Sequence, residues 1–285
     1  MRQHRHEVDR IRTVCWFNCL WITVGAKRTH QMDVLIERPL DLGHDATTDL
    51  KNKWRSYSKG AHVPQPRLVD AIDLRFAGSR ALLNHPCWQL LRTDSQVMEL
   101  IPTVLVSLPP AVYAVVRNSA SDNRALLITT DGWGARRLRK LERHVGLDSL
   151  ACLVALLRLS AESGSSGQSF DFGCAVCRML LIMGPWLFAH GIAQSIVEYV
   201  EGCVLPMATH NGQRPGFGEL GFLQAARRLS GVANLFEANE NKVLTNIQRV
   251  ELRLDLLDDK YSLELSELVG AVTMPTTSST CEAER

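Results

Sequence analysis

Apolar residues recur every three or four positions in the first part of this chain, and this spacing most limits what the chain can fold into. Between Val8 and Gly25 one face of a helix would carry Ile11, Val14, Cys15, Leu20, Trp21 and Val24. The segment 240–258 repeats the pattern with Val243, Ile247, Val250, Leu254 and Leu257. Residues so spaced share a face of an α-helix, not of a strand. Since 46% of the residues are apolar, enough to bury a core, the sequence predicts an all-α fold.

Glycines and prolines divide the first 92 residues into five predicted helical segments, which we expect to form one compact unit. The segments are 8–25, 29–37, 49–59, 64–78 and 80–91, and the last is broken at Pro86. Pro at the start of a helix and Gly just after its end are the usual boundary residues. Residues 1–92 are therefore predicted to form an N-terminal helical domain.

The rest of the chain is predicted to form a larger helical region over residues 93–273. A Ser/Gly-rich stretch near 160–169 is interpreted as a linker, and residues 274–285 as a disordered tail. A short strand at 126–130 has no evident partner strand. Helical segments begin near residue 172 and cover 189–204, 219–229 and 240–258, separated by a glycine-rich loop at 211–221.

Charge is distributed unevenly between these two parts. Residues 1–92 contain 15 Lys and Arg against 9 Asp and Glu, whereas the remainder contains 17 against 21. A basic front end is thus joined to a mildly acidic body. Such asymmetry is typical of proteins in which one part binds a polyanion.

One segment of the front end has a distinctive spacing. Trp54 is followed by an aromatic residue three positions later, Tyr57, then by Gly60 and Pro64, and an apolar helix follows. This pattern resembles the latter half of the phage-repressor-type (Xre-like) helix-turn-helix. Upstream, the residues that match the first and second helices of that family are Trp16, Leu20, Gly25, Met32 and Leu35. The resemblance covers about a quarter of the chain.

The resemblance implies which residues would contact duplex DNA. They are the exposed polar residues of the segment 49–59, namely Lys51, Asn52, Lys53, Arg55 and Lys59. Together with Arg67 the cations lie in a stretch, 51–67, that contains no acidic residue. The sequence departs from the family because ERPLDLGHDATT lengthens the connection between Met32 and Trp54. The alternative is a solvated helix face and a packing arrangement used without DNA.

Other residue patterns that suggest chemistry have simpler explanations. Cys174 and Cys177 have the spacing of a zinc or redox pair, but no second pair exists, so we interpret the cysteines as buried thiols. His85, just before Pro86, is predicted to hydrogen-bond the backbone of a turn. Glu251, Asp255 and Asp258 are expected on a solvated helix face. The sequence therefore predicts no catalytic residue, metal or cofactor.

The sequence lacks a clear signal-peptide cleavage site, and its longest apolar stretch, 172–190, contains Arg178 and the pair Gly184 and Pro185. We interpret this stretch as a buried core helix, kinked or ended at Gly184 and Pro185, and expect a cytoplasmic protein without a membrane span.

The predicted function is a regulatory protein that binds duplex DNA through its N-terminal unit and senses a signal or forms a homodimer through its helical body. The alternative is a non-enzymatic interaction or effector module, of a mobile-element or phage-defence system, whose N-terminal unit binds a partner protein.

Overall fold

The structure is a computed structural model that describes residues 5–37, 50–117, 130, 132–218, 220–240, 243–258 and 277–278. Almost all of the regular structure in these residues is helical, so the predicted all-α class is confirmed. The N-terminal part contains α1 (Glu7–Val24), η1 (Asp33–Glu37), α2 (Leu50–Ser58), α3 (Pro66–Arg75), α4 (Ser79–Leu83) and α5 (Pro86–Leu91). The larger part contains α6 (Val97–Ser107), α7 (Pro110–Val116), α8 (Ala135–Arg143), α9 (Leu147–Glu162), α10 (Ser166–Ala189), α11 (Ala193–Tyr199), η3 (Val200–Val204), η4 (Leu205–Ala208), α12 (Gly221–Asn239) and α13 (Asn246–Leu257).

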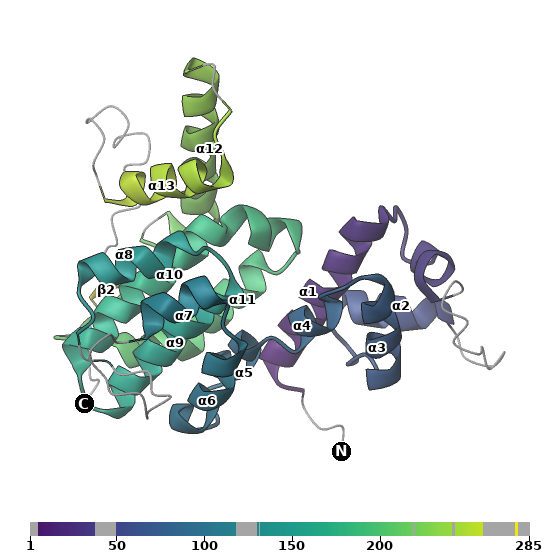
Figure 1. The fold of residues 1–285 in the computed structure, drawn as a ribbon, viewed down its shortest axis with the longest axis horizontal. Coiled ribbons are helices and arrows are strands. Elements are labelled where there is room, and N and C mark those ends of the chain that lie inside the picture. The colour runs from purple at the N-terminus through teal and green to yellow at the C-terminus, as the bar shows by residue number, and fades with distance from the viewer. Residues whose placement is uncertain are drawn as a thin grey trace, which may run out of the picture.

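Two apolar cores organise these helices. The larger core surrounds α9 and α10, which pack along each other at the centre of the body. The smaller core joins α1 to η1, α2, α3 and α4 on the other side of the molecule (Figure 1). We call the helices of the smaller core the N-terminal unit and the rest the helical body.

Helix α1 belongs to both cores. Its first half buries Val8, Ile11 and Cys15 in the body, and its second half buries residues such as Trp16 and Leu20 in the N-terminal unit. Gly25 ends α1 in the left-handed conformation (φ 64°), as the sequence predicts. The two cores are thus connected through one continuous helix.

The smaller core ends earlier than the predicted domain boundary at residue 92. Its last buried residue is Leu83, and α5 instead places Trp88, Leu90 and Leu91 in the core of the body. The predicted break at Pro86 is confirmed, because α4 ends at Leu83 and α5 begins at Pro86. The break lets the two halves of segment 80–91 serve different cores.

The interpretation of 160–169 as a linker is wrong. The segment forms the end of α9, a turn over 163–165, and the start of α10. Two of the serine hydroxyls donate to carbonyl oxygens of their own helices, that of Ser160 to Leu156 at 2.8 Å and that of Ser169 to Ser166 at 2.9 Å. Serine side chains bonded in this way are compatible with helix.

Helix α10 is the central helix of the body. The sequence predicts that it is kinked or ends at Gly184 and Pro185, and the structure shows that it does not end there. It continues to Ala189, so Pro185 lies in its last turn. A Cβ atom on Gly184 would lie 2.9 Å from the Cβ of Ala226, so the glycine permits α12 to approach closely. Helix α10 is also long and apolar enough to cross a membrane, and 67% of its most apolar window is buried inside the protein.

Helices α12 and α13 differ most from their predicted form. Helix α12 continues ten residues beyond the predicted end at 229 and rises away from the body (Figure 1). Helix α13 begins only at Asn246, with Thr245 and Gln248 forming a capping box. Val243 and Ile247 are 87% and 77% exposed, so the first part of the predicted apolar stripe is not a buried face.

The remaining predicted segments, 126–130 and 274–285, lie largely outside the residues that the structure describes. Of the expected strand at 126–130 only Thr130 is described, and it forms a bend. Within the expected disordered tail, Thr277–Ser278 (β2) pairs antiparallel with Gln213–Arg214 (β1), and the other tail residues lie outside the described part.

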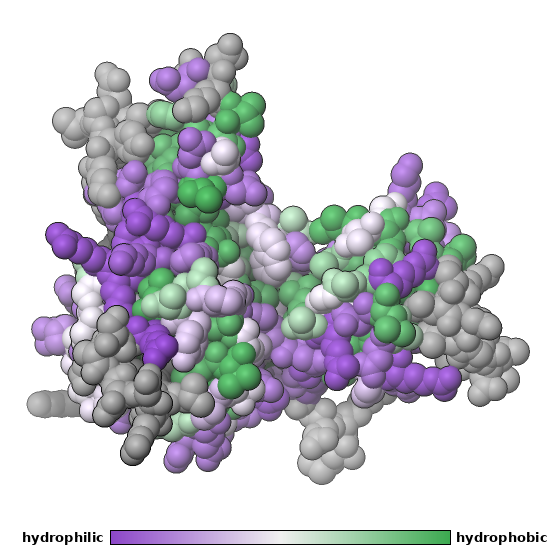
Figure 2. Space-filling model, viewed as in Figure 1, coloured by the Kyte–Doolittle hydropathy of each residue, from purple (hydrophilic) through white to green (hydrophobic). Residues whose placement is uncertain are grey.

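Figure 2 shows how polar and apolar side chains are distributed over one face of this fold. Strongly hydrophilic side chains gather over the α8 region and along the lower edge of the N-terminal unit, whereas hydrophobic ones appear on α12 and on the upper part of the N-terminal unit.

Candidate functional site

Helix α2 is held in place by an aromatic cluster at its buried face. The rings of Trp16 and Trp54 stack at a centroid distance of 6.1 Å and an angle of 9°. Tyr57 packs edge-on against both, at 5.9 Å from Trp16 and 5.6 Å from Trp54. Trp16 and Trp54 are fully buried. The structure therefore shows Trp54 and Tyr57 packed on the core, as their three-residue spacing predicts.

Gly60 follows α2 at a place that only glycine fits. Its φ is +63°, and a Cβ atom would lie 2.6 Å from both the Cγ and the carbonyl oxygen of Arg10. The Arg5 guanidinium donates to the Gly60 carbonyl oxygen. The end of α2 is thus pressed against α1, which fixes the direction of α2 relative to the N-terminal unit.

The turn after α2 differs in detail from the sequence prediction. Pro64 is buried in the connecting segment, and α3 begins two residues later, with Gln65 as its N-cap and Pro66 in its first turn. In the preceding helical segment, Met32 and Ile36 enter the core, while Leu35 is 36% exposed. Positions four apart share a helical face, whereas Leu35 is displaced from it.

The side of α2 opposite the aromatic cluster is cationic. Arg55 and Lys59 are exposed, Lys53 is half-buried, and Arg67 is exposed in the first turn of α3. We call these four residues the basic face. No acidic side chain among the described residues forms a recorded ion pair with Arg55, Lys59 or Arg67. The side chains of Lys51 and Asn52, also predicted to contact DNA, lie outside the described part of the chain.

The acidic residues of α3 have other partners. The Asp70 carboxylate lies 3.1 Å from Nη1 of Arg80. Asp73 accepts from the backbone N–H of Arg80 at 2.9 Å and from the Ser79 hydroxyl at 3.2 Å. These hydrogen bonds, the Arg80 N–H first, hold the pKa of Asp73 below its usual value. Both carboxylates are therefore engaged at α4.

The N-terminal unit also exposes apolar side chains. Leu74 is 91% exposed near the end of α3, and Val34, Leu35 and Val63 are also exposed. Arg75 donates to the Leu35 carbonyl oxygen at 3.0 Å, which brings the end of α3 beside η1. Leu35 and Leu74 therefore lie on neighbouring elements of the unit.

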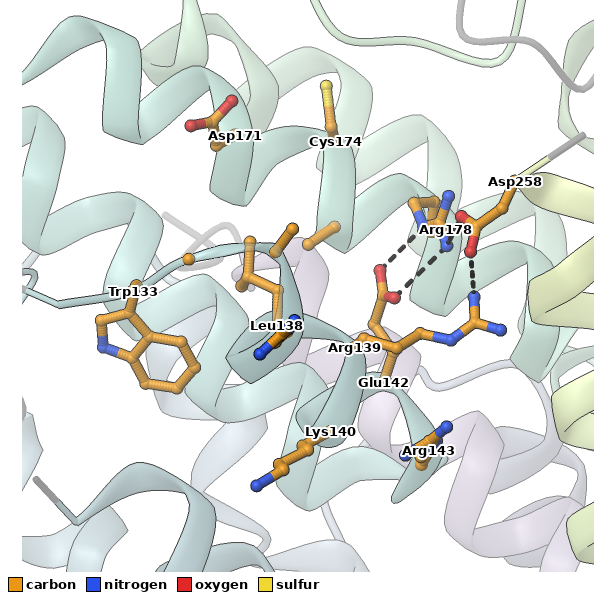
Figure 3. A pocket seen from close by; sticks show the side chains of 14 residues that line it. Trp133, Leu138, Arg139, Lys140, Glu142, Arg143, Asp171, Cys174, Arg178 and Asp258 are labelled. Carbon is orange, nitrogen blue, oxygen red and sulfur yellow. Dashed lines mark hydrogen bonds and ion pairs between the residues drawn. The ribbon is translucent and has the colours of Figure 1, made fainter. Parts of the chain in front are cut away.

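A second candidate site is a groove between α8 and α10, closed at one end by α13 (Figure 3). It encloses about 730 Å³. Its apolar lining includes Leu138, Cys174 and Ala175, and Trp133 lies at the end distant from α13. A cavity of this size is large enough for a small organic ligand.

Charged residues of three helices meet at the α13 end of the groove. Asp258 bridges two guanidiniums, with 2.6 Å to Nη1 of Arg139 and 2.7 Å to Nη2 of Arg178. Arg178 also donates to the buried Glu142, at 2.8 Å from Nε to Oε1. Asp255 lies 2.6 Å from Nη2 of Arg139. We call this set the ion-pair cluster.

Burial changes the titration of two groups in the groove. Burial raises the pKa of Glu142, although the neighbouring Arg178 acts in the opposite direction. Burial, with a smaller contribution from Asp171, raises the pKa of Cys174 to about 11. Cys174 is therefore a neutral thiol near neutral pH and not a reactive thiolate.

The sequence analysis missed the ion-pair cluster. Glu251, Asp255 and Asp258 are not a solvated face, because they pair with Arg139 and Arg143 of α8, Glu251 lying 2.5 Å from Nε of Arg143. The sequence does contain one signal for this contact. The acids of α13 are spaced by four and three residues and the two arginines of α8 by four, so each set shares one face of its helix. Nothing in the sequence indicates which two helices meet.

The structure agrees with the interpretation of His85, and with that of the cysteines only in part, because Cys203 is exposed and Cys19 and Cys174 are only partly buried. His85 caps α5, with Nδ1 accepting from the Cys87 N–H at 3.1 Å, and its Nε2 lies 3.1 Å from Asp148. Cys177 is buried, and burial raises its pKa well above the usual value. The described residues contain no group of three or more His, Cys, Asp or Glu that could hold a metal ion.

Comparisons of the chain with protein-family models, curated proteins and solved structures found no match.

Proposed function

We propose that this protein is a regulatory protein that binds duplex DNA through the basic face of its N-terminal unit, and that its helical body senses a signal or forms a dimer. The observation that carries the proposal is the cationic side of α2, positioned by Trp16, Trp54 and Tyr57. A helix that presents cations from a rigid support can contact phosphates and the edges of bases.

Charge supports this proposal over a solvated helix face. Arg55 and Arg67 are exposed without an ion-pair partner among the described residues, and the stretch 51–67 contains no acid. The nearest acids along α3, Asp70 and Asp73, are bound at α4. The basic face therefore keeps its positive potential, which attracts a polyanion.

The test is the affinity of the full chain for duplex DNA as a function of salt concentration. Each phosphate contact contributes about −0.9 to the slope of log K against log salt. The triple charge reversal Lys51→Glu, Lys53→Glu and Arg55→Glu should reduce that slope by about 3 and abolish binding at moderate salt.

A matched control places the same charge change on the helical body. Arg214, Arg227 and Arg228 are exposed, and the triple reversal to Glu there alters the net charge equally. We expect this control to retain the salt slope of the wild type. Equal weakening in both triple variants, or no binding of any duplex at low salt, contradicts the proposal.

One observation favours a second candidate, a protein-interaction module. The exposed apolar residues of the N-terminal unit, Leu74 above all, would suit a partner protein or a second copy of the chain better than they would suit a phosphate backbone. Leu74→Glu should leave DNA affinity unchanged if the basic face is the functional surface. If a protein contact is the function, Leu74→Glu abolishes self-association in sedimentation measurements while the Lys51, Lys53 and Arg55 reversal does not.

A further inference from the structure

The wall of the groove between α8 and α10 includes the Arg139 guanidinium, which is held by two carboxylates. Arg139 donates through Nη1 to Asp258 and through Nη2 to Asp255. Its Nε is buried and has no hydrogen-bond partner among the described residues. Because Arg139 lines the groove, its guanidinium is a cation that the carboxylate of a ligand in the groove can reach.

The protein itself shows that a carboxylate fits at this end of the groove. The two oxygens of Asp258 are each bound by a different guanidinium, Oδ2 by Arg139 at 2.6 Å and Oδ1 by Arg178 at 2.7 Å. Arginine pairs arranged in this way recognise planar carboxylates. Asp258 lies just beyond the end of α13, and its side chain is 27% exposed.

The rest of the groove suits an apolar molecule with negative charge. Leu138 and Ala175 belong to its apolar lining, and Trp133 lies at the end distant from α13 (Figure 3). The cations Arg136 and Lys140 at its rim are exposed and form no ion pair among the described residues. Asp171 is the one acid of the lining without a recorded ion pair in the described part of the chain. Among the described lining residues without a recorded ion pair, two are cations, Arg136 and Lys140, and one is an acid, Asp171.

We propose that this groove binds a small amphipathic carboxylate, whose carboxylate replaces that of Asp258 between Arg139 and Arg178 and whose apolar body lies along Leu138 toward Trp133. The replacement exchanges one carboxylate for another, so the charge of the ion-pair cluster does not change. The gain comes from burying the apolar body of the ligand against the apolar lining of the groove.

The inference rests on the proposed function only in treating the ligand as the signal that the helical body senses. Displacing Asp258 would remove the ion pairs that link the end of α13 to both α8 and α10, while Asp255 and Glu251 continue to hold α13 against α8. A ligand in the groove would thereby alter how α13 is held.

The first experiment is calorimetric titration of the full chain with 2-naphthoate and with its neutral counterpart 2-naphthamide. We expect the wild type to bind the carboxylate at least about tenfold more tightly than the amide. Asp258→Asn should tighten naphthoate binding about tenfold, because the internal competitor is weakened. Asp255→Asn is the matched control, since it removes the same charge from the same helix without emptying the bridging position, and it should change affinity by less than about threefold.

A second variant tests the location of the apolar body. Leu138→Trp enlarges a side chain of the apolar lining and should abolish naphthoate binding while the far-ultraviolet circular dichroism stays unchanged. Equal binding of acid and amide, no binding by Asp258→Asn, or unaltered binding by a folded Leu138→Trp variant overturns the proposal.

The same proteins separate this inference from the proposed function. The Lys51, Lys53 and Arg55 reversal should bind naphthoate as the wild type does, since the basic face and the groove lie on different parts of the molecule (Figure 1). If the wild type binds DNA but not naphthoate, the ligand site alone is refuted. If it binds naphthoate but no duplex DNA, the proposed function is refuted and the ligand site is retained.

Discussion

The N-terminal unit and the helical body both carry many arginines, but they use them in different ways. In the body, Arg139, Arg143 and Arg178 face acids of neighbouring helices and hold α8, α10 and α13 together. In the N-terminal unit, Arg55 and Arg67 face solvent with no ion pair among the described residues. The paired cations contribute to the fold, whereas the unpaired ones are available to a partner molecule.

The two regions also differ in how their cores are built. The smaller core depends on a few large aromatic side chains, chiefly Trp16 and Trp54, while the body buries many aliphatic residues along α9 and α10. Losing one side chain therefore removes a larger share of the smaller core. This difference can be tested by mutation in each region.

The largest effect is expected from Trp54→Ala. Trp54 is fully buried, and truncating such a side chain costs about 3–5 kcal/mol. Because α1 contributes to both cores, thermal unfolding followed by circular dichroism should show one transition at a lower temperature. Trp88→Ala in the body is the control and should shift the same transition. A separate early transition in Trp54→Ala alone would show that the N-terminal unit unfolds independently.

A smaller effect is expected from Gly60→Ala. The left-handed conformation costs a residue with a Cβ about 1–2 kcal/mol, and here the Cβ would also meet Arg10 at 2.6 Å. Gly25→Ala is the matched control, since Gly25 has nearly the same φ and nothing within 4 Å of the added Cβ. Denaturant unfolding should show the larger loss for Gly60→Ala, and equal losses would argue against close contact between α1 and the end of α2.

Removing one ion pair of the body should have a still smaller effect. Arg143 lies 2.5 Å from Glu251 and its side chain is half exposed, so Arg143→Gln should cost about 0.5 kcal/mol. The loss should diminish at high salt, because salt screens exposed charges. The measurement is the free energy of unfolding at low and at high salt, and a loss that grows with salt would contradict the electrostatic explanation.

The smallest effect is expected from Glu237→Gln, and only at acid pH. Hydrogen bonds from Arg249, and from the backbone N–H of Leu244, lower the pKa of Glu237 below its usual value of 4.5. An acid whose pKa is lowered by folding stabilises the fold above its unfolded pKa and loses that contribution as the pH falls below it. Melting temperatures should therefore fall less steeply below about pH 4.5 in the variant than in the wild type. If the melting temperatures of the variant and the wild type fall equally with pH, other carboxylates cause the acid sensitivity.

Much of the local structure of the N-terminal unit was predictable because it depends on neighbours in the sequence. The three-residue spacing of Trp54 and Tyr57 places both on one face, and Gly60 supplies the left-handed turn that follows. The cap by His85 is equally local, since its ring bonds the N–H two residues later. These features need only the geometry of a helix and of its ends.

The groove and the ion-pair cluster could not be predicted in this way. Asp258 meets Arg139 and Arg178 from positions 119 and 80 residues away in the chain. The acids of α13 have the spacing of a solvated face, and only the packing of α13 against α8 turns that face inward. The same limitation applied to the serine-rich segment 160–169, whose composition suggests a linker but two of whose hydroxyls bond to their own helices.

The sequence by itself determined the all-α class, most helix boundaries of the N-terminal unit and the basic stretch at 51–67, because helical periodicity, caps and charge are properties of short segments. The tertiary structure alone decided which charges are paired and which remain exposed. It did so because an ion pair or a cavity depends on which helices pack together, and that packing is a property of the whole apolar core.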